Sequence, residues 1–194
     1  VVMKRRRAEF PAVIINYHSF VTDCDQTIEV HLTVTHRIDD FDREIRFLKN
    51  NFDIVPLDQV VQQLKSGKKF SRPTVAITVD DGFKDNYELL FPTLMKYKAA
   101  VTIFLTTGVI GTEQRLWVGR LERKFLDTVR AEIRVNGIFK GVLFEISTLD
   151  KKRKVYTEIV SRLKNIDTKE RDEYLKMIGK KLGTPVYESP NMLN

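Results

Sequence analysis

The sequence predicts an α/β protein built on a parallel sheet. In the first half of the chain, short apolar and β-branched runs alternate with segments whose apolar residues recur every three or four positions. Such alternation favours parallel strands joined by crossover helices. The 194 residues suffice for a sizeable core, and contents of 42% hydrophobic and 30% charged residues exclude a disordered or collagen-like chain.

Three segments are predicted to be buried strands, because they are almost continuously apolar or β-branched: residues 12–17, 74–79 and 99–105. Polar residues follow each of them at once, namely His18, Asp80 with Asp81, and Thr106 with Thr107. Functional groups of parallel sheets gather at the carboxyl ends of strands. We therefore expect these polar residues to lie near one another.

Helices are predicted between these strands. A helix should begin at Thr35 and end at residues 50–51, since Ile38, Phe41, Ile45 and Leu48 recur at helical spacing. A second should be capped by Asp58 and stop at Gly67, and a third should begin near Pro92. Residues 21–34 are predicted to be a loop, and residues 52–57 to be extended.

The second half of the chain has a different pattern, with more helix and no recognisable chemical motif. Residues 117–135 are predicted to form one helix and residues 142–146 a strand. Two further helices are expected over residues 150–164 and 168–182, capped by Asp150 and Thr168.

The positive charge of the chain is unevenly distributed. The net charge is +7 overall, but −3 over residues 8–110 and +6 over residues 111–194. The basic run at residues 151–154 starts a polar helical pattern, which is typical of a solvated face, and is not interleaved with aromatic residues. We therefore expect no nucleic-acid partner.

Several classes of protein are excluded or left open by single features. The lone cysteine, Cys24, excludes an internal disulfide framework and a CxxC zinc site. No apolar run approaches the roughly 18 residues that span a bilayer, so no transmembrane segment is expected. The basic residues 3–7 lack a following apolar region, which argues against a secretion signal and leaves the localisation open.

Asp80 and Asp81 are the strongest candidates for chemistry. They are adjacent carboxylates at the end of a buried strand, and Gly82 lets the backbone turn after them. One carboxylate of such a pair could ligate a divalent metal while the other accepts a proton from metal-bound water. The alternative is a solvated Asp-Gly turn, which is common after strands.

The residues around this pair resemble a known family. Residues 78–82, Thr-Val-Asp-Asp-Gly, are similar to the first motif of the polysaccharide deacetylases (the NodB-homology enzymes of carbohydrate esterase family 4), usually Thr-Phe/Tyr-Asp-Asp-Gly. Further similar stretches follow the family's order: residues 15–18, 41–57, 85–87, 91–94, 100–108 and 116–122. The resemblance covers roughly residues 12–125.

The resemblance implies a fold and a domain organisation. The fold would be a partial, distorted (β/α) barrel of the deacetylase type with a mostly helical insertion. Residues 1–10 would be a basic tail, residues 11–111 the N-terminal part of the barrel, residues 112–190 the insertion, and residues 191–194 the start of a truncated remainder.

The resemblance also implies an activity, the hydrolysis of N-acetyl amide bonds on sugar polymers with a divalent metal, most often zinc. The partner would be an N-acetylated polysaccharide or a glycan precursor. Asp80 would be the catalytic base and Asp81 a metal ligand, Thr78 would shape the strand end, and His18 would line the site. Val79 departs from the family's usual aromatic residue and removes bulk but no ligand.

A second family motif, His-Ser/Thr-x-x-His, supplies two histidine ligands and is absent from this sequence. Besides His18 the sequence contains only His31 and His36, which are weak candidates for replacement ligands. We therefore expect an incomplete metal site, a chain that is inactive alone, and self-association through an unpaired sheet edge.

Two other functions stay open from the sequence. The first is a non-catalytic glycan-binding relative that has lost the metal ligands. The second is an unrelated magnesium-dependent phosphate enzyme, which is less favoured because the sequence contains no GxGxxG or GxxxxGK loop.

Overall fold

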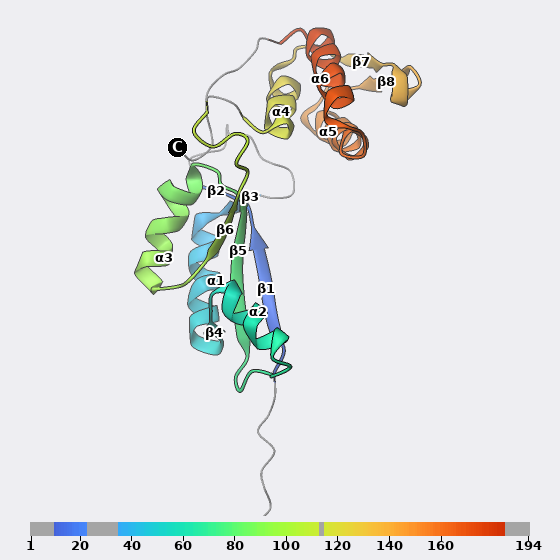
Figure 1. The fold of residues 1–194 in the computed structure, drawn as a ribbon. Helices are drawn as coiled ribbons and strands as arrows, with labels where there is room; N and C mark the ends of the chain where they lie inside the picture. Colours follow the sequence, from blue (N-terminus) through green and yellow to red (C-terminus); the bar gives the residue numbers. More distant parts are fainter. Residues whose placement is uncertain (1–9, 23–34, 113–114, 185–194) are drawn as a thin grey trace, which may run out of the picture. The chain divides into compact units, whose positions relative to one another are not determined.

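The computed structural model describes residues 10–22, 35–112 and 115–184, and these divide into two compact units (Figure 1). The first unit holds residues 10–22 and 35–112, and the second holds residues 115–184. Each unit has its own apolar core.

The first unit is built around one buried strand, β5(Thr74–Asp81). Strand β1(Ala12–Tyr17) pairs with it in parallel on one side. On the other side β4(Asp53–Ile54) pairs with its beginning and β6(Thr102–Leu105) with its end, both in parallel. The predicted α/β class with a parallel sheet is confirmed, and the predicted strand at residues 12–17 has the predicted bounds.

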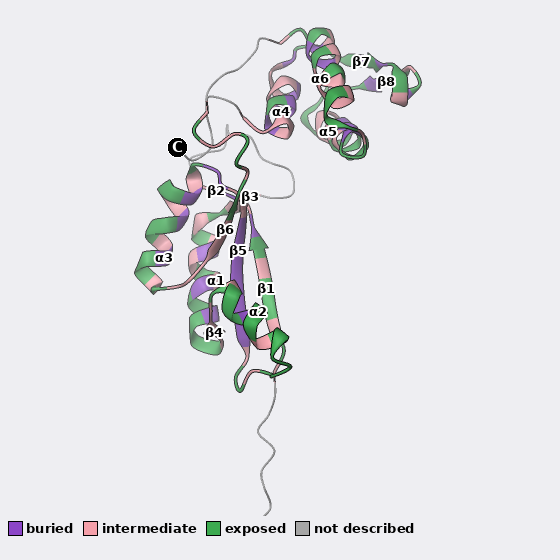
Figure 2. Cartoon of the chain, viewed as in Figure 1, coloured by how far each residue is buried: buried purple, intermediate pink, exposed green. Residues whose placement is uncertain are grey.

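Helices pack against this sheet. The first unit contains α1(Ile38–Asn51), α2(Leu57–Lys65), the π-helical turn η1(Asn86–Leu90) and α3(Phe91–Tyr97). Side chains of α1, η1 and α3 share one core with alternate residues of β5: Phe41, Ile45, Leu48, Leu90, Leu94, Val75, Ile77 and Val79. Because strand side chains alternate between faces, Thr78 and Asp80 belong to the face opposite this core. Figure 2 shows how deeply β5 is buried.

Some predicted boundaries in the first unit are wrong. Residues 35–37 are not helical but form β3(Thr35–Arg37), which pairs in parallel with β2(Ser19–Val21). Asp58 lies inside the first turn of α2, which Pro56 precedes, and bonds to the adjacent amide of Gln59 instead of capping the helix. The rest of the predicted loop, residues 23–34, lies outside the described residues.

The second unit packs three helices with a β-hairpin. The helices are α4(Trp117–Asp127), α5(Leu149–Leu163) and α6(Thr168–Leu182). Strands β7(Glu132–Val135) and β8(Val142–Glu145) are antiparallel, and the short 3₁₀ turn η2(Gly137–Phe139) lies between them. Their shared core includes Phe125, Phe139, Ile146, Ile159 and Ile178.

One long helix over residues 117–135 was the wrong prediction for this unit. Helix α4 ends at Asp127 because Thr128 is extended and its hydroxyl donates to the Leu182 carbonyl oxygen at 2.7 Å. Residues 132–135 alternate between exposed and buried, which is the two-residue period of a strand. Val129, which lies within the predicted helix, is 99% exposed.

The capping residues of α5 and α6 lie one or two positions before the predicted ones. The hydroxyl of Thr148 accepts from the Lys151 amide, and the carboxylate of Asp167 accepts from the Glu170 amide. Asp150 and Thr168 therefore lie in the first turns of their helices. Acidic and hydroxyl side chains follow one another at both helix starts, and the pattern does not say which one caps.

The predicted division at residues 10/11, 111/112 and 190/191 stays a prediction, as do the barrel and the insertion. Most of the predicted basic tail and all of residues 191–194 lie outside the described residues. Among the described helices, none has the length and apolar character required to cross a membrane. Strand β1 pairs only with β5 among the described strands, so self-association through this edge remains a prediction.

The core behind β1 should control the stability of the first unit. Phe41 is fully buried, and its ring lies edge-on to Tyr17 and Phe20 at centroid distances of 5.1 and 5.2 Å. Phe41→Ala should lower the free energy of unfolding by about 3–5 kcal/mol, because it opens a cavity in a packed core. Chemical denaturation followed by circular dichroism measures this change.

Phe47→Ala on the same helix is the matched control. Phe47 is 59% exposed, so its loss should cost less than about 1 kcal/mol. Equal destabilisation by the two variants would contradict the described packing of α1.

Candidate functional site

A chain of hydrogen bonds across β1 and β5 fixes the carboxylate of Asp80. The Thr78 hydroxyl donates to Asn16 Oδ1 at 2.8 Å, and Asn16 Nδ2 donates to Asp80 Oδ2 at 3.0 Å. The register that pairs Asn16 with Thr78 brings all three side chains to the face of the sheet opposite α1 and α3. The Asp80 side chain remains 37% exposed, so it is held in place and still reaches solvent.

Asp81 has an unusual backbone conformation. Its φ is +72°, and the Gly82 amide donates to the Asp80 carbonyl oxygen at 2.9 Å around it. This bond and this φ are those of a classic γ-turn, which is rare and strained. The turn interrupts strand alternation immediately after Asp80, and Asp81 Oδ1 accepts from the Thr106 hydroxyl at 3.3 Å.

The next position favours glycine. Gly82 has φ +74°, and a Cβ atom there would lie 2.5 Å from Leu105 Cδ2 in the neighbouring strand. A larger residue would therefore strain the backbone and displace the Leu105 side chain, so the geometry of the strand end favours the glycine of the Asp-Asp-Gly sequence.

His18 lies beside Asp80, with its Nε2 3.7 Å from Asp80 Oδ2. The segment after the carboxylate pair fixes the backbone around His18. Asn86 Nδ2 donates to the His18 carbonyl oxygen at 2.8 Å, and Asp85 accepts from the Ser19 hydroxyl and the Phe20 amide. Asn86 is 1% exposed, so these contacts are shielded from water.

The structure thus brings His18, Thr78 and Asp80 together, with Asp81 adjacent in sequence. His36 contacts other residues. Its Nε2 is 3.2 Å from Glu44 Oε2, and its ring is edge-on to Tyr17. His31 lies outside the described residues. Within residues 10–22, 35–112 and 115–184, no group of three or more His, Cys, Asp and Glu side chains is arranged to hold a metal.

Sequence reasoning missed three residues of this site: Asn16, Asp85 and Asn86. Asn16 and His18 are two positions apart, and such side chains point to the same face of an extended segment. The sequence could therefore have suggested that Asn16 lies near His18. Asp85 and Asn86 gave no such signal, because the strand order that places them beside residues 18–20 depends on tertiary structure.

The arrangement is suited to proton transfer. An exposed carboxylate, oriented by a fixed amide donor and adjacent to an imidazole, can take a proton from a bound water. The Asp80 side chain is partly exposed, so this strand end is open to solvent.

Comparison with known proteins finds a family that is similar to this region. Residues 67–136 match the family model described as polysaccharide deacetylase. This part of the chain is thus similar to the polysaccharide deacetylase family. The chain is also 33% identical over 78 residues to the putative polysaccharide deacetylase YxkH of Bacillus subtilis, a match that covers 40% of this chain and 28% of YxkH. The resemblance predicted from residues 78–82 and their surroundings is confirmed.

Solved deacetylase structures are also similar. IcaB from Ammonifex degensii matches with a TM-score of 0.46 and 16% identity, covering 96% of this chain and 94% of its own. The Streptococcus pyogenes deacetylase PplD, in complex with acetate, matches with a TM-score of 0.44 and 19% identity, covering 62% and 53%. Both TM-scores are below 0.5, so the similarity to the family rests on the sequence matches.

The anchoring of His18 by Asn86 can be tested on stability. Asn86→Ala removes the donor to the His18 carbonyl oxygen and leaves that oxygen without this bond. The free energy of unfolding should fall by about 1–3 kcal/mol, as for other buried hydrogen bonds. Chemical denaturation measures the loss, and the imidazole resonances of His18 should shift in NMR spectra of the variant.

Asn51→Ala is the control, because Asn51 is exposed and its amide bonds only within α1, to the Phe47 carbonyl oxygen. It should change the stability by less than about 0.5 kcal/mol and leave the His18 resonances in place. Unshifted His18 resonances in Asn86→Ala would show that this contact does not position His18.

Proposed function

We propose that this chain supplies the catalytic base and one metal-binding carboxylate of an enzyme that removes acetyl groups from N-acetylated polysaccharides. One observation carries the proposal: Asp80, held by Asn16 and Thr78, lies at the end of the central strand inside a region that matches the polysaccharide deacetylase family model. The proposed reaction is amide hydrolysis, in which water and the N-acetyl group give acetate and a free amine.

Asp80 is the proposed general base. Asn16 occupies its Oδ2, and Oδ1 accepts no hydrogen bond from the described residues. This oxygen would take the proton of the attacking water as the water oxygen bonds to the acetyl carbon. The proton is then returned to the nitrogen as the C–N bond breaks, so that the base is regenerated.

His18 is proposed to help position the Asp80 carboxylate. Its imidazole lies within ion-pair distance of Asp80 Oδ2 and is partly exposed. An imidazole N–H there would attract the carboxylate oxygen and help to hold it in place.

The metal that the family implies, most often zinc, would supply Lewis-acid polarisation of the carbonyl oxygen and of water. Asp81 is the ligand proposed from the first motif. Catalytic zinc typically needs three protein ligands, and the described part of the chain gathers no such group. The described residues therefore do not fit a complete zinc site. The remaining ligands would come from residues outside the described part of the chain.

The family also implies that the parallel sheet is part of a distorted (β/α) barrel. Two features support this proposal: helices α1 and α3 cover one face only, and the functional side chains lie on the other. In such barrels, catalytic residues come from the carboxyl ends of the strands, as Asp80 and Asp81 do here.

The test measures acetate release from an N-acetylglucosamine oligosaccharide with added zinc. Two proteins are compared: the 194-residue chain, and the product of the full reading frame that contains it. The 194-residue chain should be inactive or nearly so, because the described residues lack a complete metal site. Asp80→Asn in the full product should lower kcat by about 10²–10⁴-fold, the usual contribution of a general base.

Asp150→Asn is the charge-matched control, since its side chain is 84% exposed in the second unit and should leave kcat unchanged. Full activity of the Asp80→Asn protein would overturn the role of Asp80. Zinc-dependent acetate release by the purified 194-residue chain would overturn the assignment of ligands outside the described residues.

A further inference from the structure

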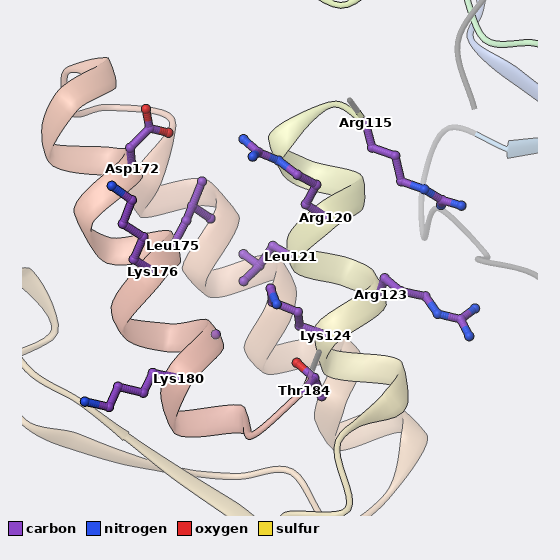
Figure 3. A pocket seen from close by; sticks show the side chains of 11 residues that line it. Arg115, Arg120, Leu121, Arg123, Lys124, Asp172, Leu175, Lys176, Lys180 and Thr184 are labelled. Carbon is purple, nitrogen blue, oxygen red and sulfur yellow. The ribbon is translucent and has the colours of Figure 1, made fainter. Parts of the chain in front are cut away.

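The second unit contains a basic pocket between α4 and α6 (Figure 3). Its volume is about 580 Å³, within the range of sites that hold small ligands. Lysine and arginine dominate its lining, and Asp172 is the one acidic residue among the lining side chains. The cationic side chains are Arg115, Arg120, Arg123, Lys124, Lys176 and Lys180.

Two of these cations extend from α4 toward α6. Figure 3 shows Arg120 and Lys124 pointing across the pocket, whereas Arg115 and Arg123 point away from α6. The stem of Lys124 packs against Gly179, where a Cβ atom would lie 3.1 Å from Lys124 Cε. Partial burial, together with the neighbouring Arg120, lowers the pKa of Lys124 below its ordinary value. The protein thus holds like charges close together.

Three cations at this pocket are exposed and have no carboxylate partner among the described residues: Arg120, Lys176 and Lys180. Arg123, by contrast, pairs with Asp127 at 2.7 Å. Exposed cations without acidic neighbours are available to an external anion.

The basic surface continues past this pocket. A second hollow of about 760 Å³ shares Lys180 with the first and is also lined by Arg130, Arg134 and Lys181. Glu132 is its one acidic lining residue. The two hollows meet at Lys180, and we call them together the α4–α6 groove. Cations that line two adjoining hollows fit successive charges of a linear polymer better than a single small anion.

We infer that the α4–α6 groove binds a segment of an acidic polysaccharide through the anionic groups of successive sugars. Cations along the groove would pair with these groups, and Asp172 would accept hydrogen bonds from sugar hydroxyls. The choice of a glycan rests on the proposed function, whereas the anion-binding character rests on the groove alone.

The lining argues against a nucleic acid. Surfaces that bind single strands place aromatic side chains where bases can stack, and none of the described residues that line either hollow is aromatic. Leu121 and Leu175 instead line the first hollow and offer apolar surface to the faces of sugar rings.

The test uses oligogalacturonate, a carboxylated oligosaccharide with no N-acetyl group, titrated calorimetrically into the 194-residue chain at low ionic strength. The triple variant Arg120→Gln, Lys176→Gln, Lys180→Gln should weaken binding about tenfold, as expected for the loss of three exposed ion pairs. The control variant Lys154→Gln, Lys164→Gln, Lys169→Gln removes the same charge from exposed positions outside the groove. It should weaken binding less than about twofold.

Three results would overturn the inference: no binding by the wild-type chain, equal losses in the two triple variants, or tighter binding of an oligothymidylate of equal charge that the groove variant abolishes. Circular dichroism checks that both variants are folded. Because oligogalacturonate carries no acetyl group, Asp80→Asn should bind it as the wild type does. Binding by the 194-residue chain, with no deacetylation by the full reading-frame product, would overturn the proposed function alone. Deacetylation by the full product, with no binding by the 194-residue chain, would overturn the groove alone.

Discussion

The hydrogen bond from Asn16 Nδ2 to Asp80 Oδ2 joins the packing of the first unit to its candidate chemistry. It exists because β1 and β5 pair in a register that places Asn16 beside Thr78, one pleat before Asp80. That register depends in turn on the burial of β5, since a shift by one residue would turn Val75, Ile77 and Val79 away from the helices. The hydrophobic core thus determines where the carboxylate lies.

The end of the same strand combines constraint with exposure. The γ-turn at Asp81 and the close approach of Gly82 to Leu105 stop β5 sharply, so the two carboxylates follow a fully buried segment without being buried themselves. Backbone strain of this kind persists only where the surrounding structure imposes it.

The second unit differs from the first in charge, because its cations gather along the α4–α6 groove whereas residues 8–110 carry net negative charge.

Much of the first unit could be predicted from the sequence, because the buried strands and α1 carry strong hydrophobic periodicity. The pair Asp80 and Asp81 was recognisable from its place after a strand and from its motif. The contacts of Asn16, Asp85 and Asn86 could not be recognised from the sequence, since they join residues 64–68 positions apart through the order of the strands.

In the second unit the prediction of one helix over residues 117–135 was wrong, because short-range apolar spacing around residues 125–135 is compatible with either a helix or a strand. The α4–α6 groove could not be predicted, because it combines side chains from two helices that pack only in the folded chain.

The most direct measurement compares kcat and KM for N-deacetylation in the Asn16→Ala variant of the full reading-frame product. Asn16 does not take part in proton transfer in this account; it positions Asp80. The account predicts that kcat falls about tenfold with KM unchanged, because the base is present but no longer oriented. Asn16→Asp cannot donate the hydrogen bond and should be no better. An unchanged kcat in Asn16→Ala would contradict the claim that this hydrogen bond positions the base.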